Sequence, residues 1–225
     1  MRLLVLVFPL VAILPRLGAQ LIVNGGFESN ALAPSENYRY LDNGDSTSIT
    51  GWTVQNDGDG ERPYLMRYGG GGSVEPYPVP SGTFAMDLNI GSGVSTTFAV
   101  TAGTTYTVSF LAQSYQADAD LRVTLAGEQR LVTVHQNYSA ADPYTFELLT
   151  TTFTPSVSSS NAVLQFFNPS TGADYKGYYL DDVTVTSAVP EPAMSALLAS
   201  SLALVLATSL RRRSSQSGLV KSIGG

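Results

Sequence analysis

The sequence predicts an all-β protein: an antiparallel jelly-roll β-sandwich, preceded by a signal peptide and followed by a single transmembrane helix. Apolar residues recur at every second position in many short stretches between residues 20 and 187, which is typical of half-buried strands. Turn residues interrupt these stretches at short intervals. No stretch before the C-terminal segment sustains a helical period, so a single domain of two packed sheets is expected over residues 20–187.

The composition excludes several classes of protein. The chain of 225 residues has no cysteine, which excludes disulfides, zinc–thiolate sites and thiol catalysis. Its formal net charge is −6, and six of its 12 basic residues lie in the terminal segments, so the domain between them is more acidic still. An acidic surface repels phosphate backbones and argues against nucleic-acid binding.

Residues 1–19 are predicted to be a signal peptide. Arg2 gives the segment a positive start, and residues 3–14 form an uncharged apolar run that is too short to span a membrane. Residues 17–19 end in small side chains, as a signal-peptidase site does. Signal peptidase is therefore an expected partner, and Gln20 the expected first residue of the exported protein.

About nine strands are predicted in the domain, and they are rich in the Thr, Val, Tyr and Phe residues that strands favour. Alternation is clearest where Tyr106, Val108 and Phe110 share one face. The expected strands are residues 21–23, 84–88, 96–100, 105–111, 121–125, 130–134, 146–153, 162–167 and 178–185. Residues 55–82, rich in glycine and proline, are expected to form a long irregular region.

Four short pieces resemble galactose-binding-like and carbohydrate-binding-module sandwiches. They are Leu-Ile-Val-Asn-Gly-Gly-Phe-Glu at residues 21–28, Gly51-Trp52, the strand at residues 106–110, and Tyr-Tyr-Leu-Asp-Asp-Val-Thr-Val at residues 178–185. The resemblance implies that the first and last strands lie side by side, often with a structural calcium ion nearby.

The alternation of the last strand suggests where such an ion would bind. If Tyr179, Val183 and Val185 face inward, period two places Asp181 inward as well. A buried carboxylate must be paired, hydrogen-bonded or bound to a metal. Glu28 is the expected co-ligand of a structural Ca²⁺, with backbone carbonyls completing the oxygen shell. The alternative is that Asp181 accepts backbone N–H groups and Glu28 is solvated.

Aromatic residues in or beside the long irregular region are candidate ligand-binding residues for a glycan. Sugar sites place aromatic side chains beside polar groups, and the candidates are Trp52, Tyr64, Tyr68 and Tyr77. The alternative for Trp52 is a place in the core, since large aromatic side chains dominate cores.

No catalytic residues are predicted, and we expect the protein not to be an enzyme. His135 is the only histidine, and there is no Gly-x-Ser-x-Gly elbow. Spacing alone leaves open a glycosidase pair among four carboxylates. These are Glu28, Glu61, Asp87 and Glu147.

The C-terminal residues 188–213 form a separate segment. Its parts are, in order, Pro190-Glu191-Pro192, the uncharged run of residues 193–210, and Arg211-Arg212-Arg213. As a helix the run would be about 27 Å long, close to the roughly 30 Å hydrocarbon core of a bilayer. Arginines after an apolar helix mark its cytoplasmic end.

This order of parts resembles the PEP-CTERM sorting signal of Gram-negative bacteria. The resemblance implies recognition by an exosortase-type membrane transpeptidase, cleavage near the motif, and delivery to the cell surface or extracellular matrix. Residues 214–225 extend beyond the basic cluster, where such signals usually stop, and are expected to be a disordered tail. The alternative is a plain C-terminal membrane anchor.

The sequence thus predicts an exported surface or matrix protein that passes through the cytoplasmic membrane. Its β-sandwich is expected to bind glycans or to act in adhesion within the exopolysaccharide. Two alternatives stay open: a structural surface protein with no small ligand, and a polysaccharide-active enzyme.

Overall fold

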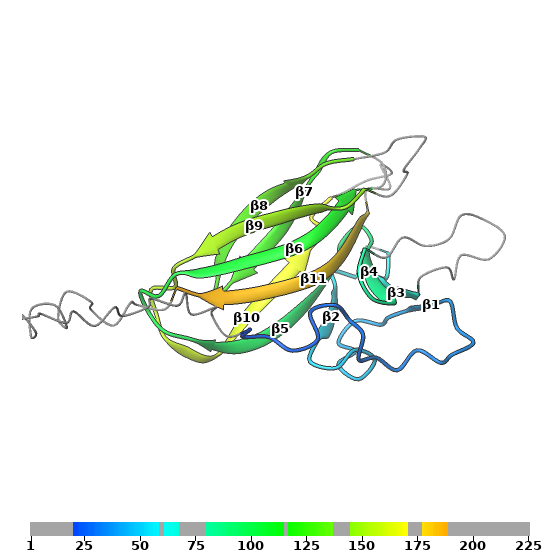
Figure 1. Ribbon diagram of the computed structural model, residues 1–225, viewed down its shortest axis with the longest axis horizontal. Coiled ribbons are helices and arrows are strands. Elements are labelled where there is room, and N and C mark those ends of the chain that lie inside the picture. The colour runs from blue at the N-terminus through cyan, green and yellow to red at the C-terminus, as the bar shows by residue number, and fades with distance from the viewer. Residues whose placement is uncertain are drawn as a thin grey trace, which may run out of the picture. The chain divides into compact units, whose positions relative to one another are not determined.

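The computed structural model describes residues 20–58, 61–67, 80–114, 117–136, 145–170 and 177–188. These residues contain eleven strands and no helix (Figure 1). The strands are β1 (Tyr38–Tyr40), β2 (Thr53–Asn56), β3 (Tyr64–Arg67), β4 (Phe84–Leu88), β5 (Ser92–Val100), β6 (Tyr106–Ser114), β7 (Ala119–Leu125), β8 (Glu128–Val134), β9 (Glu147–Phe153), β10 (Ser159–Phe167) and β11 (Tyr178–Ser187). The predicted all-β class is therefore confirmed.

Several predictions fall on residues outside these ranges. The signal peptide, the sorting signal with its apolar run, and the tail are among them, as are Tyr68 and Tyr77. Within the described ranges, no helix has the length and apolar character needed to cross a bilayer.

The strands form two antiparallel sheets. The order is β1-β3-β4-β11-β6-β9 in the six-stranded sheet and β2-β5-β10-β7-β8 in the five-stranded sheet. One hydrophobic cluster draws side chains from both sheets, so the sheets pack face to face as a sandwich. Figure 1 shows β11 and β6 passing in front of β10, which belongs to the other sheet.

Aromatic side chains fill the centre of this core. Phe166 of β10 meets Phe110 of β6 edge-on at a centroid distance of 5.1 Å, so this contact joins the two sheets. Trp52 packs against Phe166 at 6.4 Å and against Phe27 at 5.1 Å. Its indole N–H donates to the Asn24 carbonyl at 2.9 Å, which satisfies the only polar group of this buried side chain.

The chain between Gln20 and Gly25 lies beside β11, as the resemblance implied. The N–H of Leu21 donates to the Val185 carbonyl at 3.1 Å, and the N–H of Val183 donates to the Gly25 carbonyl at 3.0 Å. These two bonds are too few for a ladder, and residues 21–23 are not a strand, contrary to the prediction. The prediction that residues 21–23 lie beside the last strand is correct, but the prediction that they form a strand is wrong.

The facing of β11 also differs from the prediction. Tyr178 and Leu180 point into the core, and Val183 and Val185 do so after a bulge between Asp181 and Thr184. The bulge adds a residue, with Asp182 at φ 47°, and so changes which positions face inward. Asp181 therefore lies on the outer side of the sheet, although it is fully buried.

Three strands were not predicted. Strands β1, β2 and β3 have only three or four residues each, and β3 falls inside the stretch that was expected to be irregular. β1 and β3 form one edge of the six-stranded sheet.

Candidate functional site

A row of side chains crosses the outer face of the six-stranded sheet. Register places Tyr40 opposite Tyr64, Tyr64 opposite Asp87, Asp87 opposite Tyr179, and Tyr179 opposite Gln113. Directly opposed residues of antiparallel strands point to the same side of a sheet. The residues beside them in sequence belong to the core: Leu41, Leu65, Met86, Leu88, Leu180 and Ala112. We call these five opposed side chains the outer-face row.

Tyr40 and Tyr64, at one end of this row, pack with a third tyrosine, Tyr38, which lies beside the row on the same side of β1. Tyr38 and Tyr40, two residues apart on β1, are each 46% exposed. Together with Tyr64 they form a mutually packed trio, with centroid distances of 5.3 to 5.9 Å. The Arg62 guanidinium lies 5.3 Å from the centre of the Tyr40 ring. An exposed aromatic cluster beside a cationic group is a typical recognition surface.

The middle of the row is apolar around one buried acid. Tyr179 belongs to a small cluster with Met66 and Ala85, separate from the main core, and Phe146 packs on Tyr179 at 6.3 Å. Asp87 lies beside this cluster and is 1% exposed. The row therefore runs from exposed rings into a desolvated region.

Asp87 carries the electrostatics of the row. Burial raises the pKa of its carboxyl to about 7, the Tyr64 side chain acts in the opposite direction, and the charge of Glu61 raises it slightly more. Neither carboxylate oxygen makes a hydrogen bond of normal geometry within the described residues. Near neutral pH this carboxyl is therefore divided between a neutral form, which can donate a hydrogen bond, and a charged form, which only accepts.

A second polar site lies where residues 20–25, called the chain start below, meet β11. The backbone at Gly26 runs beside two carboxylates, because a Cβ there would lie 3.3 Å from Asp182 Oδ1 and 3.6 Å from Asp181 Oδ1. Glu28 is near as well, since its charge acts on Asp181. Side-chain atoms of both Glu28 and Asp181 therefore lie within 4 Å of the position that a Cβ of Gly26 would occupy.

Asp181 accepts a backbone N–H group, as the alternative to calcium expected, whereas Glu28 accepts backbone N–H groups as well, which that alternative did not expect. Asp181 Oδ1 accepts the N–H of Asp182 at 2.7 Å, while Oδ2 is buried and makes no hydrogen bond of normal geometry within the described residues. Glu28 Oε1 is not merely solvated: it accepts the N–H groups of Thr83 at 2.7 Å and Phe84 at 3.0 Å. Burial, with smaller contributions from Asp182 and Glu28, raises the pKa of Asp181 to about 8. The backbone N–H groups of Asp182 and Ser81 both act to lower the pKa of this carboxyl.

This site offers only oxygen ligands, the kind that calcium prefers. The buried Oδ2 of Asp181 is an acceptor that a cation would satisfy. However, no three His, Cys, Asp or Glu side chains in the described ranges form a group that could hold a metal ion by themselves. A calcium ion here would therefore depend on Glu28, Asp181 and backbone or water oxygens.

His135 pairs with a carboxylate on the neighbouring sheet edge. Its backbone N–H donates to Glu147 Oε1 at 2.6 Å, and its ring Nδ1 lies 3.1 Å from Oε2. The hydrogen bond to Glu147 raises the pKa of this half-exposed imidazole. The four carboxylates considered for a glycosidase pair thus have different surroundings. Glu28 accepts backbone N–H groups, and Glu147 pairs with His135. Of the four, only Glu61 and Asp87 are linked, because the charge of Glu61 raises the pKa of Asp87.

Of the predicted ligand-binding residues that the structure describes, one belongs to the outer-face row. Tyr64 lies in it, whereas Trp52 is 2% exposed in the core and cannot offer a ring face to a ligand. Trp52 is therefore corrected to a core residue. The sequence analysis missed Tyr38 and Tyr40, although two aromatic residues at alternate positions are the signal of one strand face.

The described part of the chain is a two-sheet β-sandwich with an aromatic row on one outer face. The chain belongs to the family described as "Protein of unknown function (DUF642)", whose profile matches residues 20–186. No curated protein matches the chain.

Solved structures with a similar arrangement include carbohydrate-binding modules. The CBM22-1 xylan-binding domain of Paenibacillus barcinonensis is 13% identical with a TM-score of 0.41, over 67% of this chain and 92% of its own. TmCBM61 in complex with β-1,4-galactotriose is also 13% identical, with a TM-score of 0.43, over 76% of this chain and 99% of its own. An arabinose-bound α-L-arabinofuranosidase is 14% identical with a TM-score of 0.48, over 76% of this chain but only 27% of the enzyme.

Proposed function

We propose that the protein binds polysaccharide chains through the outer face of its six-stranded sheet. The observation that carries this proposal is the outer-face row, in which the exposed ring of Tyr40, with Tyr38 beside it, continues through Tyr64 into buried polar side chains. Aromatic rings beside a few placed polar groups are the usual composition of a small-molecule site. The flat C–H faces of sugar rings can pack on Tyr38 and Tyr40, where burial of apolar area stabilises the contact.

Polar groups around the tyrosines supply hydrogen bonds for sugar hydroxyls. Arg62 lies over Tyr40 and pairs with Asp42 at 2.9 Å, and both of these charged side chains are more than half exposed. Asp87 lies deeper, opposite Tyr64 in the β3–β4 pair, and is 1% exposed. The proposed contacts with the glycan are therefore made by β1 and the residues that precede β3.

Binding of the full-length protein to a panel of immobilised polysaccharides tests the proposal. Replacing Tyr38 and Tyr40 together by Ala is expected to weaken binding at least about tenfold, because two exposed rings account for several kcal/mol of contact. The matched control is Leu131→Ala, which removes a 64% exposed apolar side chain from β8 of the other sheet. Equal loss in both variants, or none in either, would count against the outer face as the site.

The protein is proposed to bind glycans without cleaving them. Glu28 accepts backbone N–H groups and Glu147 pairs with His135. The charge of Glu61 acts on Asp87, but Asp87 is 1% exposed, which does not favour a paired acid and base at a glycosidic bond. Incubation with the polysaccharides that it binds should release no reducing ends above the level of a heat-treated sample.

The location proposed for this activity is the cell surface or the extracellular matrix. Its support is the order of Pro190-Glu191-Pro192, the apolar run of residues 193–210 and the arginine cluster, all outside the described residues. Signal peptidase and an exosortase-type transpeptidase are the proposed processing partners. Mass spectrometry of the mature protein tests this: a C-terminus near residue 190 fits sorting, whereas an intact residue 225 in the membrane fraction fits a plain anchor.

A structural Ca²⁺ is proposed at Glu28 and Asp181. Its support is the convergence of these carboxylates beside Gly26 and the buried Oδ2 of Asp181. The ion would neutralise negative charge between the chain start and β11 and so stabilise their contact.

A further inference from the structure

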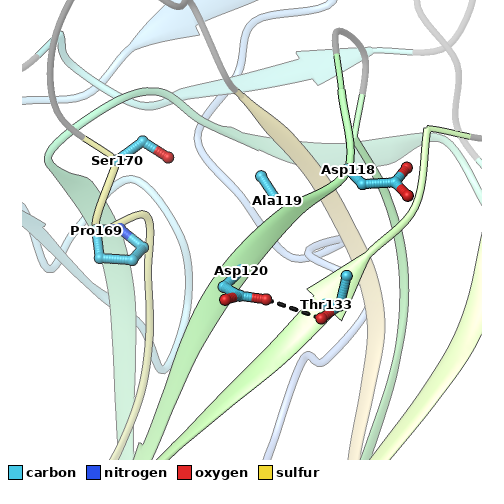
Figure 2. Close-up of a pocket in the computed structure, with 6 residues that line it drawn as sticks. All are labelled: Asp118, Ala119, Asp120, Thr133, Pro169 and Ser170. Carbon is cyan, nitrogen blue, oxygen red and sulfur yellow. Dashed lines mark hydrogen bonds between the residues drawn. The ribbon is translucent and has the colours of Figure 1, made fainter.

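A pocket of about 330 Å³ lies at the end of the five-stranded sheet where β7 begins and β8 and β10 end. It shares no lining residue with the outer-face row. Figure 2 shows Pro169 and Ser170 on one side, Asp118 and Thr133 on the other, and Ala119 and Asp120 between them. This volume is at the lower end of the range that small-molecule sites occupy.

The acidic wall of the pocket is held in place by hydrogen bonds. Thr133, directly opposite Asp120 in the β7–β8 pair, donates its hydroxyl to Asp120 Oδ1 at 2.8 Å (Figure 2). Asp118 Oδ1 accepts the N–H of Gln136 at 2.8 Å. Each of these contacts engages one carboxylate oxygen, so both carboxylates are oriented and keep a second oxygen that can accept hydrogen bonds.

The opposite wall is fixed from the core. The N–H of Ser170 donates to Asn168 Oδ1 at 3.0 Å, and the buried Asn168 amide donates to the Leu88 carbonyl at 3.0 Å. This anchors the chain that leaves β10, and with it the hydroxyl of Ser170 at the pocket edge.

A buried hydroxyl lies near two residues of the same pocket, although its own residue, Tyr178, does not line it. Tyr178 is 0% exposed, and its hydroxyl makes no hydrogen bond of normal geometry within the described residues. Burial raises the pKa of this phenol to about 12, the Ser170 side chain acts in the opposite direction, and the charge of Asp120 raises it further. Two residues that act on the hydroxyl are thus pocket residues. A buried hydroxyl is costly unless a partner satisfies it, and Ser170, itself a pocket residue, is the side chain that acts on this one as a hydrogen-bond partner.

We infer that this pocket is a second binding site, which takes a single neutral polyhydroxylated ring. Asp118 and Asp120 would accept hydrogen bonds from the ring hydroxyls, and Tyr178 and Ser170 offer hydroxyls of their own. Within the described ranges, no Lys or Arg lines the pocket, and no group of three metal-ligating side chains forms. The choice of a sugar over another polyol rests on the proposed function.

Titration of the full-length protein with free monosaccharides tests this inference, with D-glucose, D-galactose, D-mannose and L-arabinose as separate probes. We expect at least one to bind saturably, and Asp120→Asn to raise its dissociation constant at least about tenfold, because a hydrogen bond to a charged acceptor is lost. Asp120 is exposed, so this variant should fold normally. Tyr178→Phe, which removes only the buried hydroxyl, should also weaken the binding of that sugar.

The Tyr38→Ala/Tyr40→Ala variant separates this inference from the proposed function. It should bind the monosaccharide like the wild type, whereas Asp120→Asn should keep its polysaccharide binding. Absence of binding by all four sugars, or binding that neither Asp120→Asn nor Tyr178→Phe changes, would overturn the inference. Saturable binding of CaCl₂ at the pocket with no sugar bound would also overturn it.

Discussion

Asp87 and Asp181 are buried acids in the part of the chain that the structure describes. Each is an acid with 1% or less of its surface exposed, and burial raises the pKa of both to about 7 or 8. A buried carboxylate destabilises a fold unless a partner compensates it. Both lie on the outer side of the six-stranded sheet, one in the aromatic row and one at the chain start, where the proposed ligands would bind.

The raised pKa of Asp87 predicts a dependence of stability on pH. Up to about pH 7 the folded protein keeps this proton, whereas the unfolded chain loses it near pH 4. The folded state therefore binds more protons between these values, and the free energy of unfolding decreases as pH rises, by up to about 1.4 kcal/mol per pH unit for this group. Asp87→Asn should reduce that slope in urea unfolding from pH 5 to 7.5, while Asp181, whose pKa is raised to about 8, still contributes a slope of the same sign.

Asp42→Asn is the control for this experiment, because Asp42 is an exposed acid that pairs with Arg62. In this variant the free energy of unfolding should change with pH as it does in the wild type. An unchanged slope in Asp87→Asn would mean that Asp87 is not buried in its neutral form.

The calcium proposal predicts a change in melting temperature. An ion at a hundredfold excess over its Kd adds about 2.7 kcal/mol of stability, which corresponds to several degrees in a domain of this size. Melting of the full-length protein in CaCl₂ and in chelator should show this difference. Asp181→Asn should abolish it, and Asp42→Asn should retain it. Coincident melting curves of the wild type in the two buffers would remove the ion from the account.

At the scale of elements, β11 organises the six-stranded sheet. It pairs with β4 on one side and β6 on the other, and the chain start lies beside it through Leu21 and Gly25. A Cβ on Gly25 would lie 1.8 Å from the Val183 carbonyl oxygen, so only glycine allows this approach. The bulge of β11 lies at the same place. Before it the even-numbered residues of the strand face the core, and after it the odd-numbered residues do.

Gly25→Ala should therefore destabilise the protein by more than about 2 kcal/mol, because backbone would have to move to accommodate the methyl group. Gly26→Ala is the matched control, since its methyl group would meet carboxylate oxygens no closer than 3.3 Å. Chemical unfolding of both variants measures the difference. Equal stability of the two would show that the chain start does not pack on β11.

The long alternating strands could be predicted from sequence because period two follows directly from strand geometry. β6 and β10 are examples, whereas β1 to β3 are too short to show a period among glycines and prolines. The outer facing of Asp181 could not be predicted, because it depends on a bulge that alternation does not mark. The outer-face row could not be predicted either, because its members are brought together by the pairing of five strands. Of its tyrosines, only Tyr64 was singled out from the sequence as a candidate ligand-binding residue.

At the scale of the whole molecule, the sandwich separates its two proposed sugar sites. The outer-face row crosses the six-stranded sheet, while the pocket of Asp118, Asp120 and Ser170 lies at the end of the five-stranded sheet. An extended face with exposed rings suits the length of a polysaccharide, and a pocket suits one ring. The sites can therefore be tested independently.

The central claim is that polysaccharide lies on the tyrosines of β1. Hydroxyl-radical footprinting of the full-length protein, with and without the polysaccharide that it binds best, measures the solvent access of individual side chains. The account predicts that Tyr38 and Tyr40, each 46% exposed in the free protein, become protected, while Leu131 on the other sheet stays reactive. Protection of Leu131 with unchanged oxidation of both tyrosines would contradict it.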